Sequence, residues 1–507
     1  MTLNRIARWL ALGLGAGAAW LAFSAPAEAI PLFARQTGHN CQACHISYPE
    51  LTAYGREFKL NGYTFGESQP IPLAAALMAQ YDMINDNVIH NGTGPSLGPN
   101  CTSCNHGEII QYSVFFGGKL AENFGMFGQF SGAEFPVSGG AVNSATFAGN
   151  PAAPGSFTPV ADNTEFRYVH RFSSGSGTLE PDTVVGININ NNLTMQDVWN
   201  NVPAWRYPNG GGGIAYNISG GMGASGAGPV WTPFIDGGGA PLSSGQREIG
   251  IGVYTWWHKT VYAELSLYRA PWGAFSWLAW GQNEGGANNP NNPNDMPSDV
   301  LANYNPYYRL AYSHDWGYNS IEVGVFGISA HTYNCNPSST ACVTNQSATN
   351  GFRDVAFDAQ YQYNKGEPWV FSVQTSYEHE SNDLTAWLNS TPGVMSTPSH
   401  TINEFNINGR AYYDRKYGIN AGYSMISGSN DAILYGSNAA GPGLSNTGSP
   451  NSSWWTVELN YLPLQDIRFT LQYVMYTKLN GGNSNFDGLG NNATGQNHLT
   501  AAIWWVF

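Results

Sequence analysis

The amino-acid sequence predicts an all-β fold, a transmembrane antiparallel up-and-down β-barrel of about sixteen strands. Only 11% of the residues are charged while 14% are aromatic, which is little charge for the surface of a soluble protein. From residue 72 onward, apolar and polar residues alternate over about ten residues at a time, as in a strand whose two faces differ. Short and long connections follow one another between these stretches, which indicates an outer-membrane barrel.

Residues 1–29 predict an export signal. Two arginines precede an apolar run from Trp9 to Phe23, and Ala27–Ala29 has the small-x-small form of a cleavage site. The run of about 15 apolar residues is shorter than the roughly 20 that a spanning helix needs, which argues against a membrane anchor. We therefore expect an exported chain whose first mature residue is Ile30.

Residues 30–71 begin with a cofactor motif. Cys41-Gln42-Ala43-Cys44-His45 has the CxxCH spacing, in which two thiols form thioethers to the haem vinyl groups and the histidine is held under the iron. A redox-active dithiol would not need His45. The motif predicts one covalent haem c, attached at Cys41 and Cys44 with His45 as the proximal iron ligand.

The residues after the motif predict one short helix. Pro49 suits its first turn, Glu50 suits the positive end of its dipole and Gly62 suits its end. Three apolar side chains fall on one face at helical spacing: Leu51, Tyr54 and Phe58. Gly55 lies on the same face and weakens the pattern. Such a face covers either a haem or the barrel wall.

About 42 residues between the signal and the first strand are too few for an independently stable domain. We therefore expect residues 30–71 to form a monohaem c-type cytochrome plug that enters the lumen of the barrel from the periplasmic end. The barrel itself is expected over residues 72–507.

The alternating stretches predict sixteen strands, with ends uncertain by about two to four residues. They are 72–84, 108–119, 124–134, 164–172, 178–191, 246–257, 260–269, 304–314, 318–329, 352–363, 367–380, 402–413, 416–427, 453–463, 466–478 and 497–507. Tight turns are expected at 258–259, 315–317, 364–367, 414–416 and 463–465. An even number of strands brings both ends of the barrel to the periplasmic side, where the turns are short. The last strand ends on Phe507, and a terminal aromatic of this kind resembles the assembly signal of bacterial outer-membrane barrels.

The second axial ligand of the haem iron is open. Met78 lies on the lumen face of the first strand if its apolar neighbours face lipid, and a thioether ligand would raise the reduction potential. The alternatives are Met83, His90, His106, His39 or an open site.

Four further cysteines lie in two predicted extracellular loops: Cys101, Cys104, Cys335 and Cys342. In an exported chain such close pairs favour local disulfides, with a staple between the loops as the alternative. A metal site at Cys101, Cys104 and His106 lacks a fourth ligand. Asn105 stands where a second CxxCH motif would need its histidine.

In architecture, the whole chain resembles the fused monohaem cytochrome-porins of iron-oxidising bacteria, which are outer-membrane iron:cytochrome oxidoreductases. The specific likeness covers about 25 residues, from Cys41 to His45 and through the PELTAYGREFKLNGYTF stretch. The resemblance implies that extracellular ferrous iron gives one electron to the haem, which passes it to a periplasmic carrier, either a c-type cytochrome or a copper protein. It also implies contact with outer-membrane lipid.

The net charge of −14 argues against nucleic acid as a partner. Asp82, Asp86 and Glu108 near the loops could attract a cation, although exposed carboxylates are usually only solvated. Two other functions stay open at this point. One is a solute porin whose haem is structural or regulatory, and the other is electron uptake from a solid donor.

Overall fold

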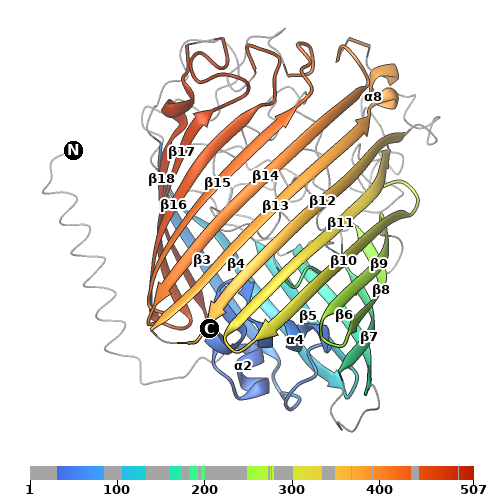
Figure 1. Cartoon of the computed structure of the whole chain (residues 1–507), viewed down its shortest axis with the longest axis vertical. Helices are drawn as coiled ribbons and strands as arrows, with labels where there is room; N and C mark the ends of the chain where they lie inside the picture. The colour runs from blue at the N-terminus through green and yellow to red at the C-terminus, as the bar shows by residue number, and fades with distance from the viewer. Residues whose placement is uncertain are drawn as a thin grey trace, which may run out of the picture.

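The computed structural model of the chain is a closed barrel in which sixteen antiparallel strands are described (Figure 1). The structure describes residues 31–84, 106–132, 160–173, 182–191, 196–199, 248–271, 275, 277, 278, 301–333, 349–366, 368–390, 392, 393, 395–435, 445–488 and 490–507. The predicted export signal and the predicted disulfide partners Cys101, Cys104, Cys335 and Cys342 lie outside these residues. None of the described helices is long and apolar enough to cross a membrane.

Each barrel strand pairs with the next one in the chain, and the last pairs with the first to close the cylinder. The strands are β3 (Leu73–Ile84), β4 (His106–Ala121), β5 (Phe124–Gly132), β6 (Val160–Phe172), β7 (Thr183–Asn190), β8 (Ile249–Trp257), β9 (Val261–Arg269), β10 (Asn305–Trp316), β11 (Asn319–Tyr333), β12 (Thr349–Asn364), β13 (Trp369–Asp383), β14 (Ser399–Tyr413), β15 (Tyr417–Gly428), β16 (Ser452–Leu464), β17 (Ile467–Lys478) and β18 (His498–Val506). The predicted all-β barrel and its sixteen strands are therefore confirmed. The largest error in a strand end is at β7, which begins five residues after the predicted start.

Alternation along the strands separates two environments. In β10, Arg309, Ala311 and Ser313 are buried inside, whereas Leu310 and Tyr312 are about half exposed outside. The same pattern runs through the strands around the barrel, so apolar side chains cover its outer surface. An apolar exterior on a closed sheet is the arrangement that satisfies every backbone group within a bilayer.

Exposed aromatic side chains gather at the short-turn ends of the strands. They include Trp257, Trp316, Tyr318, Trp369, Tyr413, Tyr417, Tyr461 and Phe469. Such a girdle marks the interface between lipid and water in outer-membrane barrels, and short turns mark their periplasmic side. The chain end at Phe507 lies at this same end of the barrel (Figure 1).

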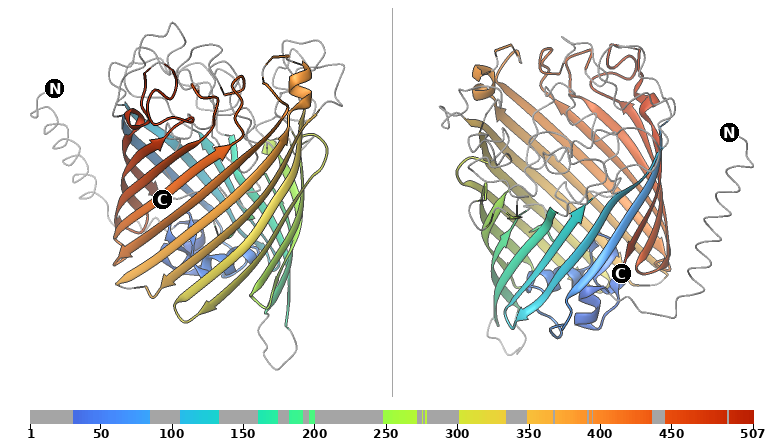
Figure 2. Two further views of the ribbon diagram at one scale, coloured as in Figure 1. Left: turned by 45° about the horizontal axis from the view of Figure 1, so that its top comes forward. Right: turned by 180° about the vertical axis from the view of Figure 1, so that it is seen from behind.

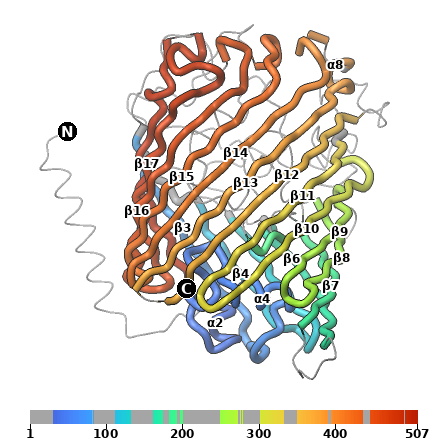
Figure 3. The backbone as a smooth tube through the Cα atoms, viewed as in Figure 1, coloured from blue at the N-terminus to red at the C-terminus, as the bar shows by residue number. Residues whose placement is uncertain are grey.

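The N-terminal segment folds into small elements inside the periplasmic end of the barrel (Figures 1 and 2). They are α2 (Leu32–Thr37), α3 (Cys41–Cys44), β1 (His45–Ser47), β2 (Glu50–Leu51) and α4 (Ala53–Leu60). The tube in Figure 3 shows this segment at the level of the turns of β14–β15 and β10–β11. We call residues 31–71 the plug.

The predicted helix start was wrong. Pro49 follows a cis peptide bond and lies in the turn between β1 and β2, and Glu50 lies in β2 rather than at a helix end. The helix begins at Ala53, where the Thr52 side chain accepts a hydrogen bond from the backbone of Gly55. Thr52 is an ordinary N-cap residue, so the signal was present but was outweighed by the proline. The predicted end at Gly62 is confirmed by its left-handed backbone.

Two other expectations need correction. The turns after β10 and β16 lie one or two residues later than predicted, because Trp316 pairs with Asn319 and Leu464 pairs with Ile467. The predicted loop 381–401 contains a helix, α8 (Thr385–Ser390), whose Ala386 is buried near the extracellular end of the barrel.

A charge on the outer surface tests the membrane assignment. We expect Leu265→Arg, in the middle of β9, to destabilise the barrel in lipid by about 2–4 kcal/mol. Leu464→Arg, beside a periplasmic turn, is the matched control and should cost no more than about 1 kcal/mol. Unfolding by denaturant in phospholipid vesicles measures both. Equal losses at the two positions would contradict a lipid-facing mid-strand surface.

Candidate functional site

The three residues of the predicted haem motif lie together in the plug. Asn40 caps α3 by accepting a hydrogen bond from the backbone of Ala43 at 3.0 Å, which holds the turn that carries Cys41 and Cys44. Both thiols are free and half-buried. His45 follows directly at the start of β1, so both sulfur atoms and the imidazole come from one short turn.

Helix α4 packs unusually close to this turn at Gly55. A Cβ atom on Gly55 would lie 2.3 Å from the carbonyl oxygen of Cys44, so only glycine fits. The Thr52 backbone donates to the same oxygen at 2.9 Å. The glycine that weakened the helical pattern in the sequence is therefore the contact that joins α4 to the CxxCH turn.

The His45 ring is placed to act as a neutral ligand. Burial lowers the pKa of His45 to about 4, and the nearby backbone of Pro49 and Glu50 offsets only part of this effect. Its Nδ1 atom is buried and forms no hydrogen bond of normal geometry with the described residues. Neutral imidazole is the form that binds iron.

Aromatic rings cover one side of His45. The His45 and Tyr48 rings lie 4.8 Å apart between centroids, and the Tyr48 and Trp504 rings lie 5.7 Å apart. Trp504 belongs to β18, so these contacts connect the motif to the barrel wall.

Burial raises the pKa of the Cys44 thiol to about 12, and the neighbouring Cys41 adds to this effect. Burial raises the pKa of the Cys41 thiol as well, so both cysteines favour the protonated thiol at neutral pH.

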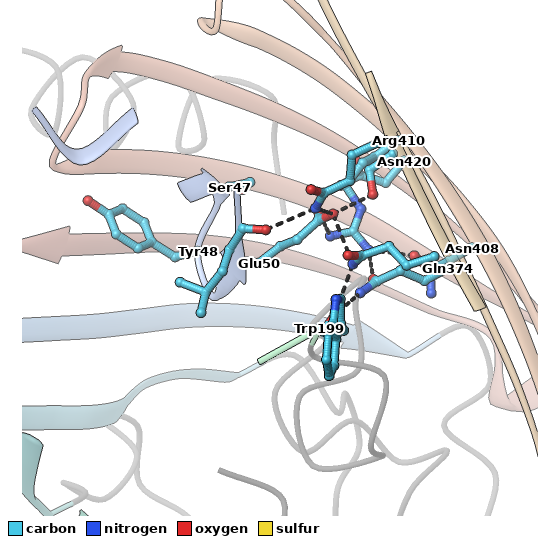
Figure 4. A network of polar contacts seen from close by, with 12 residues as sticks. Ser47, Tyr48, Glu50, Trp199, Gln374, Asn408, Arg410 and Asn420 are labelled. Atoms are coloured by element: carbon cyan, nitrogen blue, oxygen red, sulfur yellow. Dashed lines mark hydrogen bonds and ion pairs between the residues drawn. The ribbon is translucent and has the colours of Figure 1, made fainter. Parts of the chain in front are cut away.

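The strongest plug contact with the wall is a buried ion pair. Glu50 pairs with Arg410 of β14, and both side chains are buried. The same carboxylate accepts hydrogen bonds from Gln362 at 2.7 Å and from Ser372. Figure 4 shows this network, in which Arg410 also donates to Gln374 at 2.5 Å. A buried carboxylate needs such partners because the interior solvates it poorly.

Two basic residues of α4 repeat this arrangement. Arg56 donates to Gln362 at 2.7 Å and to Ser320 at 2.5 Å. Lys59 lies 3.4 Å from Glu165 of β6, which also pairs with Arg167 at 3.0 Å. The plug is therefore bound to strands on opposite sides of the cylinder rather than resting against one wall.

A segment after β7 meets the plug from the lumen side. Gln360 and Gln374 donate to the carbonyl oxygen of Trp199 at 2.9 and 2.8 Å, and Gln360 also contacts Glu50 at 3.5 Å. Trp199 is buried in one apolar cluster with Leu60 of the plug. Wall residues are thus shared between the plug and this segment (Figure 4).

Met78 lies on the inner face of β3, next to Trp504 of β18 in the strand register. Because the Trp504 ring contacts Tyr48, Met78 is on the part of the wall nearest the motif. Met83 shares the outer face with exposed Tyr81, which removes it as a ligand of a haem inside the barrel. His39 is exposed, with its ring 5.1 Å from Tyr54. His90 and the side chains of Asp82, Asp86, His106 and Glu108 lie outside the described part.

The residues present fit a covalently attached haem. Two free thiols at CxxCH spacing and a neutral imidazole on the next residue meet the chemical needs of the group. Tyr54 and Phe65 are half-buried and their rings lie 6.2 Å apart beside the motif, which gives it an apolar flank. Within the described residues, no cluster of acidic, histidine and cysteine side chains offers a site for a bare metal ion.

Sequence reasoning missed the wall residues that hold the plug, above all Arg410, Gln465 and Arg468. Gln465 accepts a hydrogen bond from the Cys41 backbone at 3.1 Å, and Arg468 donates to the Tyr48 carbonyl at 2.8 Å. The sequence signal for Arg410 and Arg468 was an arginine on the inner face of a strand, but this position does not indicate which residue the arginine will bind.

No family model and no curated protein matches the chain. Among solved structures, the outer-membrane channel DcaP of Acinetobacter baumannii is 9% identical, with 86% of this chain and 96% of that chain covered and a TM-score of 0.41. An anion-selective porin from Comamonas acidovorans is 11% identical, with coverage of 86% and 98% and a TM-score of 0.40. These likenesses concern the barrel fold alone. What the structure itself shows is a closed barrel of sixteen described antiparallel strands with an apolar outer surface.

The ion pair between Glu50 and Arg410 provides a test of plug docking. We expect Glu50→Gln to weaken docking by about 3–5 kcal/mol, because it leaves Arg410 buried without a carboxylate. Glu57→Gln is the matched control, since Glu57 pairs with the half-exposed Lys259 and should contribute less than about 1 kcal/mol.

Trypsin cleavage after Arg56 and Lys59 in the intact barrel reports this docking. Its rate should rise by about a hundredfold or more in Glu50→Gln and by less than about fivefold in Glu57→Gln. Equal cleavage of the two variants would mean that the buried ion pair does not hold the plug.

Proposed function

We propose that this chain is an outer-membrane cytochrome-porin that transfers single electrons from extracellular ferrous iron to a periplasmic carrier. Cys41 and Cys44 would hold one haem c covalently, and His45 would bind its iron. When bound, the haem supplies a one-electron redox centre. The observation that carries the proposal is the position of the CxxCH turn, which is fixed inside the periplasmic end of a membrane barrel.

The chain's own residues then have three tasks. Cys41 and Cys44 fix the cofactor, so it cannot diffuse away on the periplasmic side. Tyr54 and Phe65 present apolar ring surface beside it. Glu50 and its partners keep the plug at one place in the lumen, between an extracellular donor and a periplasmic acceptor. Met78 on the adjacent wall is the proposed distal ligand.

The periplasmic location of the motif suits a soluble acceptor. Gly38, His39 and Asn40, which precede Cys41, are exposed at the short-turn end of the barrel. A c-type cytochrome or a small copper protein is the class of partner that accepts single electrons in that compartment. Ferrous iron and a solid donor differ only in how they reach the extracellular side, and ferrous iron is the donor that the resemblance to the cytochrome-porins implies.

A solute porin with a structural or regulatory haem is the second candidate, because its barrel would be the same. The interior of this barrel argues for the first. Polar side chains that face inward are buried along much of the wall: Ser320, Gln362, Ser372, Asn420, Glu458, Gln472, Glu380 and His400. Side chains that line an open aqueous channel are exposed to water, so these described positions of the wall do not line one.

Ion conductance separates these two candidates. We expect the purified protein in a planar bilayer to conduct less than about a tenth as much as an open porin with sixteen strands, because the plug and the buried wall side chains leave little water-filled cross-section. An open porin measured in the same bilayer is the control. Conductance equal to that of the open porin would favour the solute-porin function.

Anaerobic mixing with ferrous iron tests the electron-transfer function itself. The protein, produced with c-type cytochrome maturation, should carry covalent haem whose absorption bands change to the reduced form on mixing. His45→Ala should lose the normal reduced spectrum, and Cys44→Ser should lose one thioether and weaken attachment. His258→Ala, in the turn between β8 and β9, is the control and should keep the spectrum. Absence of covalent haem in the natural sequence, or no reduction at any pH that the protein survives, would contradict the proposal.

A further inference from the structure

We propose that Arg415 is a positioning residue for the haem motif, so that a periplasmic turn of the barrel completes the cytochrome. The inference rests on the proposed function, because Arg415 can position a haem motif only if haem binds there. The contacts that support it are contacts within the protein chain itself. Arg415 lies in the turn between β14 and β15 and is buried against the plug.

Each of the five backbone carbonyl groups in Cys41–His45 accepts a hydrogen bond. The last carbonyl groups of a short helix lack partners within it. Here the Cys41 oxygen receives the His45 backbone, and the Ala43 and Cys44 oxygens receive Thr52. The two that remain are those of Gln42 and His45.

Arg415 satisfies both of the remaining groups. Its Nη1 atom donates to the Gln42 oxygen at 3.1 Å and to the His45 oxygen at 3.3 Å. The guanidinium also donates through Nε to the Gly366 oxygen at 3.3 Å and through Nη2 to Asn364, both at the turn after β12. One side chain therefore ties Gln42 and His45 of the motif to two turns of the barrel.

The backbone at Arg415 is also unusual for a hairpin turn. Asp414 and Arg415 have φ angles of 48° and 53°, a left-handed turn that favours Asn and Gly and costs other residues conformational energy. The turn between β8 and β9 has the same form, at His258 and Lys259, with φ angles of 50° and 53°. Lys259 contacts Glu57 of the plug at 2.5 Å.

Each of these two turns thus tolerates an unfavourable backbone and directs a basic side chain onto the plug. An Asn-Gly turn would connect the strands at lower cost, but it could not make these contacts. The residue choice is explained by the plug and not by the hairpin.

The consequence concerns His45. Its backbone nitrogen is fixed by the Cys41 oxygen and its carbonyl by Arg415, so the orientation of the imidazole depends on the barrel. Loss of the Arg415 contacts should loosen residues 41–45 without opening the barrel, because the cross-strand pairs of β14 and β15 do not need this side chain.

The test begins with the haem-free full-length protein in detergent. The rate of maleimide addition to Cys41 and Cys44, measured peptide by peptide by mass spectrometry, reports how firmly the turn is held. We expect Arg415→Gln to react about tenfold faster than the natural sequence, because hydrogen bonds from a charged donor are lost. Arg415→Lys, with one nitrogen in place of the planar fork, should react at an intermediate rate.

Lys416→Gln is the matched control, since Lys416 is exposed in the same turn, and it should stay within about twofold of the natural rate. In the haem-loaded protein, Arg415→Gln should also shift the midpoint potential and the absorption bands, while Lys416→Gln should not.

Thiol reactivity in a folded Arg415→Gln barrel that stays within twofold of the natural sequence would overturn the inference. If Arg415→Gln fails to form the heat-modifiable barrel, Arg415→Lys decides: a faster reaction supports the inference and an unchanged one overturns it. Failure of the proposed function has a different signature, namely absence of covalent haem in the natural sequence, which leaves the thiol measurements valid.

Discussion

The segment that carries Cys41, Cys44 and His45 takes its structure from the inner wall of the barrel. It is too short to bury a core of its own, and several of its charged side chains are buried. A buried charge is stable only beside a partner, and the partners of Glu50, Arg56 and Lys59 are wall residues on distant strands. Both the position of the plug and the shape of its motif follow from this constraint.

The same constraint connects the fold to the proposed chemistry. A redox centre useful for electron transfer across a membrane must stay at a fixed distance from donor and acceptor, and it must be shielded from water. A plug bound on opposite sides of a cylinder provides the fixed position. In the proposed function, charge crosses by electron transfer at the plug rather than by diffusion of solutes.

Much of the fold could be predicted because each barrel strand separates two media. Apolar and polar residues alternate along strands such as β10 and β16 because one face meets lipid and the other the interior. This alternation was visible in the sequence and predicted the sixteen strands. The plug has no such simple environment. Pro49 and Glu50 suggested a helix start, but tertiary contacts decided otherwise: a cis peptide bond forms the turn and Arg410 binds the carboxylate.

The residues of the candidate site also fall into a group that the sequence predicts and a group that it does not. Cys41, Cys44 and His45 could be named from their spacing because that chemistry is local. Arg410, Arg415 and Arg468 could not be named, because their partners lie several hundred positions earlier in the chain and meet them only once the barrel has closed. Met78 was placed correctly on the inner face from alternation alone, and its role as a ligand stays a prediction.

Transfer of electrons across a sealed membrane tests the central claim most directly. The haem-loaded protein is inserted into vesicles that enclose an oxidised c-type cytochrome, and ferrous iron is added outside without oxygen. The account predicts that the enclosed cytochrome is reduced with one electron for each ferrous ion oxidised, while the iron stays outside. No reduction inside, or reduction only when iron itself enters the vesicles, would contradict it.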